Sequence, residues 1–230
     1  MLILARVCDK PLKIMPHIIK FPELHTIISK YYPIGIDRND PRYEKYQGTV
    51  ELKNLVADHL NDVTKRSQWD TFIDAIKIAF PELSEVRETR RSLDTCYSVV
   101  ISINREEIDK FIYEQRLYCR LSFLGNYFCI YGLDYIQVNL NDDNKTHFEP
   151  VLTISPIKNY EGYFNRTREI IEKLFPTYRF LNYLYLRIHI DELKITPNLI
   201  KGSPFSNVFQ ALFIPKNITD YIIYGDMRYK

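Results

Sequence analysis

The stretch RLYCRLSFLGNYFCIYGLDY, residues 116–135, decides the fold that this sequence predicts. Gly125 and Asn126 stand between two runs in which apolar and polar side chains alternate, and this is the pattern of a β-hairpin. Glycine at the first central position favours a two-residue type II′ turn. Such a turn would pair Leu121 with Ile130 across the two strands.

This register sorts the hairpin into two surfaces, because side chains alternate between the faces of a strand. One face is apolar and predicts core; it carries Leu117, Cys119, Leu121, Phe123, Phe128 and Ile130. The other face is rich in tyrosine; it carries Tyr118, Arg120, Ser122, Leu124, Tyr127, Cys129, Tyr131 and Tyr135. We expect this second face either to lie under a helix or to contact a partner. Cys119 and Cys129 point to opposite faces and should not form a disulfide.

Strand patterns continue on both sides of the hairpin. The β-branched run 95–103 predicts a strand before it, and 134–140 lengthens its second strand. Residues 148–157 then return as a further strand. Between the first strand and the hairpin, 104–111 predicts a short helix capped by Asn104. The result is an antiparallel β-meander, which needs only local connections.

Amphipathic helices account for much of the remaining chain. Apolar residues recur at helical spacing in five segments, which span 21–32, 50–63, 67–80, 160–175 and 203–213. Ser67 and Ser206 are the expected N-caps of two of them, and 179–190 fits either a strand or a helix. The predicted fold class is therefore α+β, an antiparallel meander packed with amphipathic helices. We expect one domain over 1–230, with a helical subdomain at 1–92 and a sheet-rich portion at 93–230.

The composition is that of an ordinary globular protein. Of 230 residues, 46% are hydrophobic and 26% are charged, and the formal net charge of +2 provides no bulk field for nucleic acid or for an anionic membrane. No run approaches the roughly 20 apolar residues of a membrane span, and MLILARVCDK is too short an apolar start for a signal peptide. The cysteines form no CxxC pair, which favours a reducing compartment. We expect a cytoplasmic protein.

The sequence contains no convincing catalytic constellation. Its five histidines show no metal-ligand spacing, and no glycine-rich phosphate loop is present. The strongest enzyme alternative is a divalent-metal site acting on nucleic acid, built from Asp40, Glu51 and Lys53. Glu51 and Lys53 are two apart on a predicted helix and therefore face differently. We expect no catalytic residue, no metal and no cofactor.

Two C-terminal runs, IIEKLFPTYRFL at 170–181 and SPFSNVFQALF at 203–213, resemble the C-terminal parts of small bacterial α+β immunity proteins encoded beside polymorphic toxins. The resemblance implies a cytosolic, non-enzymatic protein that neutralises a toxin domain by covering it. It implies a protein partner, but it assigns a binding role to no particular residue, because these families share no binding motif that matches this sequence.

The hairpin register places the expected partner contact at its tyrosine face and at the next turn of the meander. The contact residues would be Tyr127, Tyr131, Tyr135, Asp142 and Asp143. Aromatic anchors supply much of the affinity of protein interfaces, and charges accelerate the encounter. A self-assembling structural protein is the alternative, because the same face would serve contacts between copies.

Overall fold

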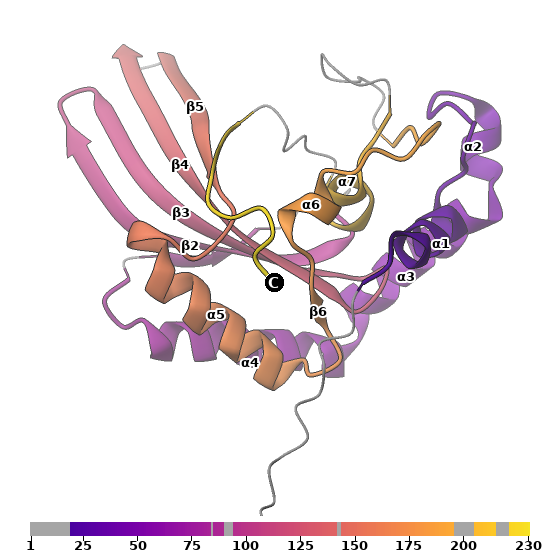
Figure 1. Cartoon of the computed structure of the whole chain (residues 1–230), viewed down its shortest axis with the longest axis horizontal. Coiled ribbons are helices and arrows are strands. Elements are labelled where there is room, and N and C mark those ends of the chain that lie inside the picture. Colours follow the sequence, from indigo (N-terminus) through magenta and orange to yellow (C-terminus); the bar gives the residue numbers. More distant parts are fainter. Residues whose placement is uncertain (1–18, 84, 90–93, 142–143, 196–204, 215–220) are drawn as a thin grey trace, which may run out of the picture.

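A computed structural model describes most of the chain, and it is an α+β protein as the sequence predicts (Figure 1). The described residues are 19–83, 85–89, 94–141, 144–195, 205–214 and 221–230. The helices are α1 (Phe21–Tyr31), α2 (Pro41–Lys45), α3 (Gln47–Asn61), α4 (Val63–Ala79), the 3₁₀ turn η1 (Lys158–Tyr160), α5 (Glu161–Leu174), α6 (Tyr183–Leu186) and α7 (Val208–Leu212). The strands are β1 (Glu85–Glu88), β2 (Cys96–Ile108), β3 (Phe111–Ser122), β4 (Tyr127–Asn141), β5 (Asn144–Thr153), β6 (Arg179–Phe180) and β7 (Ile222–Tyr224). No helix within these ranges is long and apolar enough to span a membrane.

The sheet is a meander with parallel additions. Strands β1 to β5 are neighbours in chain order and all pair antiparallel. Two short strands then join in parallel, β6 beside β4 and β7 beside β5. The sheet is therefore mixed, whereas the sequence predicts a purely antiparallel one. The edge strand β1 comes from the charged segment before β2, which falls within the predicted helical subdomain at 1–92.

The loop of the β3–β4 hairpin is longer than the predicted type II′ turn. Leu121 pairs with Phe128 instead of Ile130, and the loop spans residues 123–126. The shift is two residues, so every side chain keeps its predicted face. The first half of the loop is apolar and packs into the core, and this packing outweighs the local turn preference of glycine.

The predicted helix at 104–111 is wrong, because β2 continues through Ile108 and turns at Asp109. Pairing with β3 extends over this whole length, with a register shift between Ser102 and Asn104. Long-range strand pairing here overrides a local sequence that suits a helix equally well.

Helices cover both faces of the sheet (Figure 1). On one face lie α4 and α5, whose contact brings Trp69 and Phe72 into a core cluster with Leu117 and Phe128 of the sheet. On the other face lie α6 and α7. The core cluster contains residues from both sides of the predicted boundary at residue 92.

Two helix starts differ from prediction. Helix α4 begins at Val63, where the Asp62 carboxylate accepts hydrogen bonds from two backbone amides, rather than at Ser67. Helix α7 is capped by Asn207, which forms a reciprocal capping box with Gln210. The ambiguous segment 179–190 contains both of the predicted elements, since β6 is followed by α6.

The C-terminal end of α3 docks on the β3–β4 loop through His59. Its ring stacks on Phe123 with 4.4 Å between centroids, and its carbonyl accepts a 2.6 Å hydrogen bond from the Tyr97 hydroxyl. Burial, helped by the charge of Lys65, lowers the pKa of His59 to about 4, although Asp62 pulls in the opposite direction. The folded state therefore favours the neutral imidazole.

Acid should weaken this contact. Between pH 6.5 and about pH 4, His59 is protonated in the unfolded chain and neutral in the folded chain. The free energy of unfolding therefore decreases as the pH is lowered through this range. We expect His59→Phe, which keeps a ring against Phe123, to lose less stability than the parent between pH 7 and pH 4. Urea unfolding midpoints at each pH measure this. Parallel pH profiles for the two proteins would contradict it.

Candidate partner-binding surface

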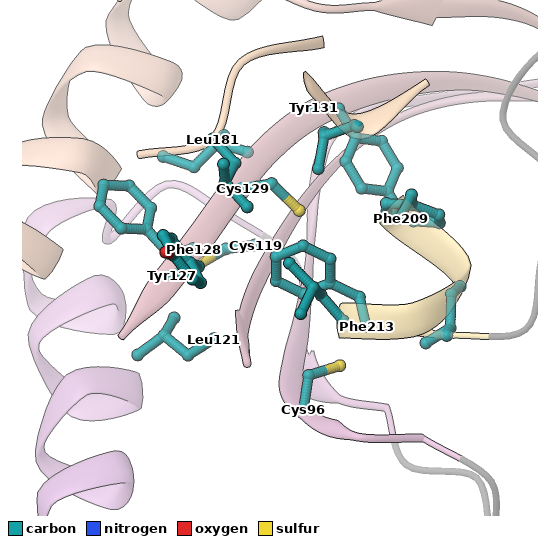
Figure 2. Close-up of a cluster of buried hydrophobic side chains, with 14 of the residues drawn as sticks. Cys96, Cys119, Leu121, Tyr127, Phe128, Cys129, Tyr131, Leu181, Phe209 and Phe213 are labelled. Carbon is teal, nitrogen blue, oxygen red and sulfur yellow. The ribbon is translucent and has the colours of Figure 1, made fainter. Parts of the chain in front are cut away.

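The predicted tyrosine face is covered by a helix near the hairpin turn. Tyr131 is 5% exposed, and its ring packs edge-on against Phe209 of α7 (Figure 2). Tyr127 is 1% exposed, and its hydroxyl donates a 2.7 Å hydrogen bond to Glu23 of α1. Neither side chain is available to a partner, so the surface expected at these two positions is interior.

Arg120 explains why this part of the face is polar although it is buried. The guanidinium donates 2.8 Å hydrogen bonds to the Tyr131 hydroxyl and to the Ser98 hydroxyl. The residue is 5% exposed. Tyr131 also stacks on Tyr118, with 5.2 Å between ring centroids. Arginine and tyrosine here are internal hydrogen-bond partners.

The buried thiols beside this network are not suited to chemistry. Cys96, Cys119 and Cys129 are free and buried, and burial raises the pKa of each, for Cys96 to about 12. A thiol with such a pKa holds almost no thiolate near neutral pH.

The remaining predicted contacts lie further along the sheet. Tyr135 is half-buried, and its ring lies under the Arg116 guanidinium at 3.6 Å from the ring centroid. Its hydroxyl donates to Gln137. Asp142 and Asp143 lie outside the described residues. Tyr135 is therefore the one predicted contact that the structure describes near the surface.

An exposed apolar surface lies at the far end of the sheet, on the face opposite to Tyr135. Cross-strand pairing aligns Ile108 with Phe111 and Phe111 with Val138, and in the next row Tyr113 with Ile136 and Ile136 with Phe148. Ile108 is 67% exposed, Phe111 55% and Phe148 47%. We call this surface the distal face; its apolar side chains are Ile108, Phe111, Tyr113, Ile136, Val138 and Phe148. The exposed Glu106 pairs with Tyr113 at the edge of the same face.

The distal face is exposed because the strands are longer than the helical layer that covers them. In Figure 1, β3, β4 and β5 extend away from the labelled helices. The layer begins at η1, where the Tyr160 hydroxyl donates to Asp134 at 2.9 Å and the Tyr113 hydroxyl donates to the same carboxylate at 3.1 Å. Tyr160 also packs on Gly132, where an added Cβ would lie 2.4 Å from its ring. These contacts fix the border between covered and exposed sheet.

The free strand edges beside the distal face are charged or interrupted. Beyond Ser102, β2 has no outer neighbour within the described chain, and its edge carries Arg105 paired to Glu107 at 3.4 Å. On the other side β5 contains Pro150, which donates no backbone hydrogen bond. Charges and proline discourage strand addition. The free edges are therefore protected against strand addition, while the distal face presents exposed apolar side chains.

The residues of the enzyme alternative do not converge on a common site. Asp40 caps α2 and binds the Arg42 guanidinium, while Lys53 contacts Glu44. Glu51 accepts a 3.4 Å hydrogen bond from Gln47 and lies 3.8 Å from Lys30. Within the described ranges no three His, Cys, Asp or Glu side chains gather as metal ligands do.

The sequence analysis does not predict the distal face, because its residues come from several strands. Ile108 and Phe111 lie in the segment predicted as a helix, where acidic neighbours hide the alternation. Phe148 comes from another strand and joins them only through cross-strand register. When this segment is aligned as a strand, Ile108 shares a face with Glu106 and lies opposite to Glu107, so the usable signal is the pairing of Ile108 with Phe111.

No protein-family model, curated protein or solved structure matches this chain.

Proposed function

We propose that this chain is a non-enzymatic, cytoplasmic binding protein that neutralises a toxin domain by covering it, and that the contact is made by the distal face. The observation that carries the proposal is the group of large apolar side chains exposed together on one sheet face. Exposed apolar patches of this kind mark interaction sites on soluble proteins. The resemblance of the C-terminal runs to immunity proteins supplies the class of partner.

Phe111 and Phe148 are the natural anchors of such a contact. Both are aromatic and exposed, and they belong to adjacent rows on the same face. Aromatic side chains that insert into a partner's pocket carry a large share of the affinity, while the surrounding contacts exclude water. The strands beneath them are fixed by the sheet, so little order is lost on binding.

Phe111→Ser should weaken partner binding about ten- to one-hundredfold, because truncating a central aromatic anchor costs on the order of 1.4 to 3 kcal/mol. The test co-expresses the chain with the toxin domain encoded beside its gene and scores growth. Isothermal titration of the purified pair then gives the affinity. The fold should be intact, because the Phe111 side chain is largely exposed.

Val63→Ser is the matched control. Val63 is 81% exposed at the start of α4. The neighbouring His59 packs on the β3–β4 loop, at the opposite end of the hairpin from Phe111, so the loss of Val63 should leave growth and affinity unchanged. If Phe111→Ser protects cells and binds as well as the parent, the distal face is not the contact. If the unaltered chain gives no protection at all, the toxin-neutralising function itself fails.

A further inference from the structure

We propose that, without its partner, the distal face pairs with the distal face of a second copy of this chain. The dimer does not depend on the proposed function. Only one consequence rests on that function: partner and second copy would compete for the same surface. Two sheet faces pack about 10 Å apart with interdigitating side chains, and the rows of the distal face supply such side chains from both copies.

The helical layer restricts how two distal faces can meet. In each copy η1 and α5 stand on the same sheet face as the distal face, with Tyr160 at their border. A two-fold axis parallel to the strands would bring the two helical layers into collision. An axis perpendicular to the strands places each layer beyond the strand ends of the other copy. The structure therefore favours antiparallel strand directions across the contact.

This arrangement brings opposite charges together. The β2–β3 turn at one end of the distal face carries Asp109 and Lys110. The start of the helical layer at the other end carries Lys158 and Glu161. All four side chains are exposed, and none forms an ion pair within the described residues. A two-fold axis perpendicular to the strands places the β2–β3 turn of one copy at the helical layer of the other copy. Asp109 then lies near Lys158, and Lys110 lies near Glu161.

The same contact is repeated by symmetry, so each charge pair occurs twice in one dimer. The formal net charge of +2 offers little long-range repulsion between copies. The apolar area is modest, and interfaces at the low end of the size range are weak. We therefore expect a dissociation constant on the order of 1 to 100 µM.

Sedimentation velocity of the purified chain between 1 and 500 µM tests the pairing. We expect a concentration-dependent shift from monomer to dimer. Phe111→Ser should raise the dissociation constant about tenfold or more, because it removes the same anchor from both copies. Val63→Ser should sediment like the parent. A parent chain that is monomeric at every concentration overturns the proposal, as does a dimer that Phe111→Ser leaves unchanged.

Charge exchange tests the orientation. Lys110→Glu alone and Glu161→Lys alone should each weaken the dimer about three- to tenfold, because each creates a like-charge contact twice. Combining them should restore the parent's dissociation constant and its salt dependence. Additive weakening in the double variant would exclude the antiparallel arrangement.

The two proposals can fail separately. A monomeric parent that still binds and neutralises its toxin domain removes the dimer and leaves the proposed function. A dimer broken by Phe111→Ser, with protection of cells unchanged, keeps the self-pairing and removes the toxin contact from this face.

Discussion

Arg120→Leu should lower the free energy of unfolding by about 3 to 5 kcal/mol, a large part of the roughly 5 to 15 kcal/mol that holds a typical domain together. The substitution removes the hydrogen bond that the Tyr131 hydroxyl accepts, the one shown for it within the described residues. It also removes one of the two hydrogen bonds shown for the Ser98 hydroxyl, which keeps Thr89 at 2.8 Å. A buried hydroxyl without a partner costs about 1 to 3 kcal/mol. Leucine is also shorter than arginine, so a cavity adds to the loss.

The cost should arise mainly from the Tyr131 hydroxyl that is left without a partner, and a combined variant can show this. Arg120→Leu with Tyr131→Phe removes the guanidinium together with that hydroxyl, while Ser98 keeps its hydrogen bond with Thr89. We expect the double variant to be more stable than Arg120→Leu alone, because the hydroxyl of residue 131 is no longer left unpaired. Urea unfolding, monitored by the fluorescence of the single tryptophan Trp69, gives the free energies of unfolding of the parent, of Arg120→Leu and of the combined variant.

Two results would contradict this account. If Arg120→Leu unfolds at the parent's urea concentration, the guanidinium contributes nothing that apolar contacts cannot replace. If the double variant loses the sum of the two separate changes, Arg120 and Tyr131 act independently and do not form a network. Arg120→Lys is a further check, since an ammonium cannot match the planar fork that bonds both hydroxyls.

The hairpin shows how far sequence reasoning reaches. Alternation along residues 116–135 predicts which face each side chain takes, because the strand period depends only on backbone geometry. The pairing is two residues off, because the apolar loop residues Phe123 and Leu124 are buried. The amphipathic segments at 21–32 and 160–175 are likewise confirmed as helices.

The candidate site could not be predicted in the same way. A tyrosine-rich strand face has the same sequence pattern whether it is packed under a helix or exposed to solvent. Tyr131 is buried because Phe209 of α7 packs against it, and this contact cannot be read from the strand's own sequence. Exposure of the distal face depends on where the helical layer begins relative to the strand ends. That relation is set by Tyr160 on Gly132 and Asp134, contacts between segments far apart in the chain.

Trp69→Ala should cost about 3 to 5 kcal/mol, the usual loss for truncating a fully buried large aromatic side chain. Trp69 is completely buried, and its ring stacks on Tyr97 of β2 at 5.0 Å between centroids and contacts Phe72 at the same distance. These contacts hold α4 on the sheet. Because the substitution removes the fluorophore, far-UV circular dichroism in urea is the appropriate measurement.

Two variants separate packing from other effects of changing α4. Trp69→Phe should cost much less than alanine, since it keeps a ring in the site and removes an indole N–H that has no acceptor among the described residues. Val63→Ala on the same helix, where Val63 is 81% exposed, should change stability by less than about 0.5 kcal/mol.

Equal losses of stability for Trp69→Ala and Trp69→Phe would mean that the aromatic ring does not hold the helix on the sheet. A loss for Val63→Ala close to that for Trp69→Ala would mean that burial does not set the cost, because alanine is the better helix former at both positions. The expected order of stability is Trp69→Ala far below Trp69→Phe, and Trp69→Phe slightly below the parent. This order follows if an aromatic ring at position 69 contributes a large part of the packing of α4 on β2, beside Phe72 and Ile76.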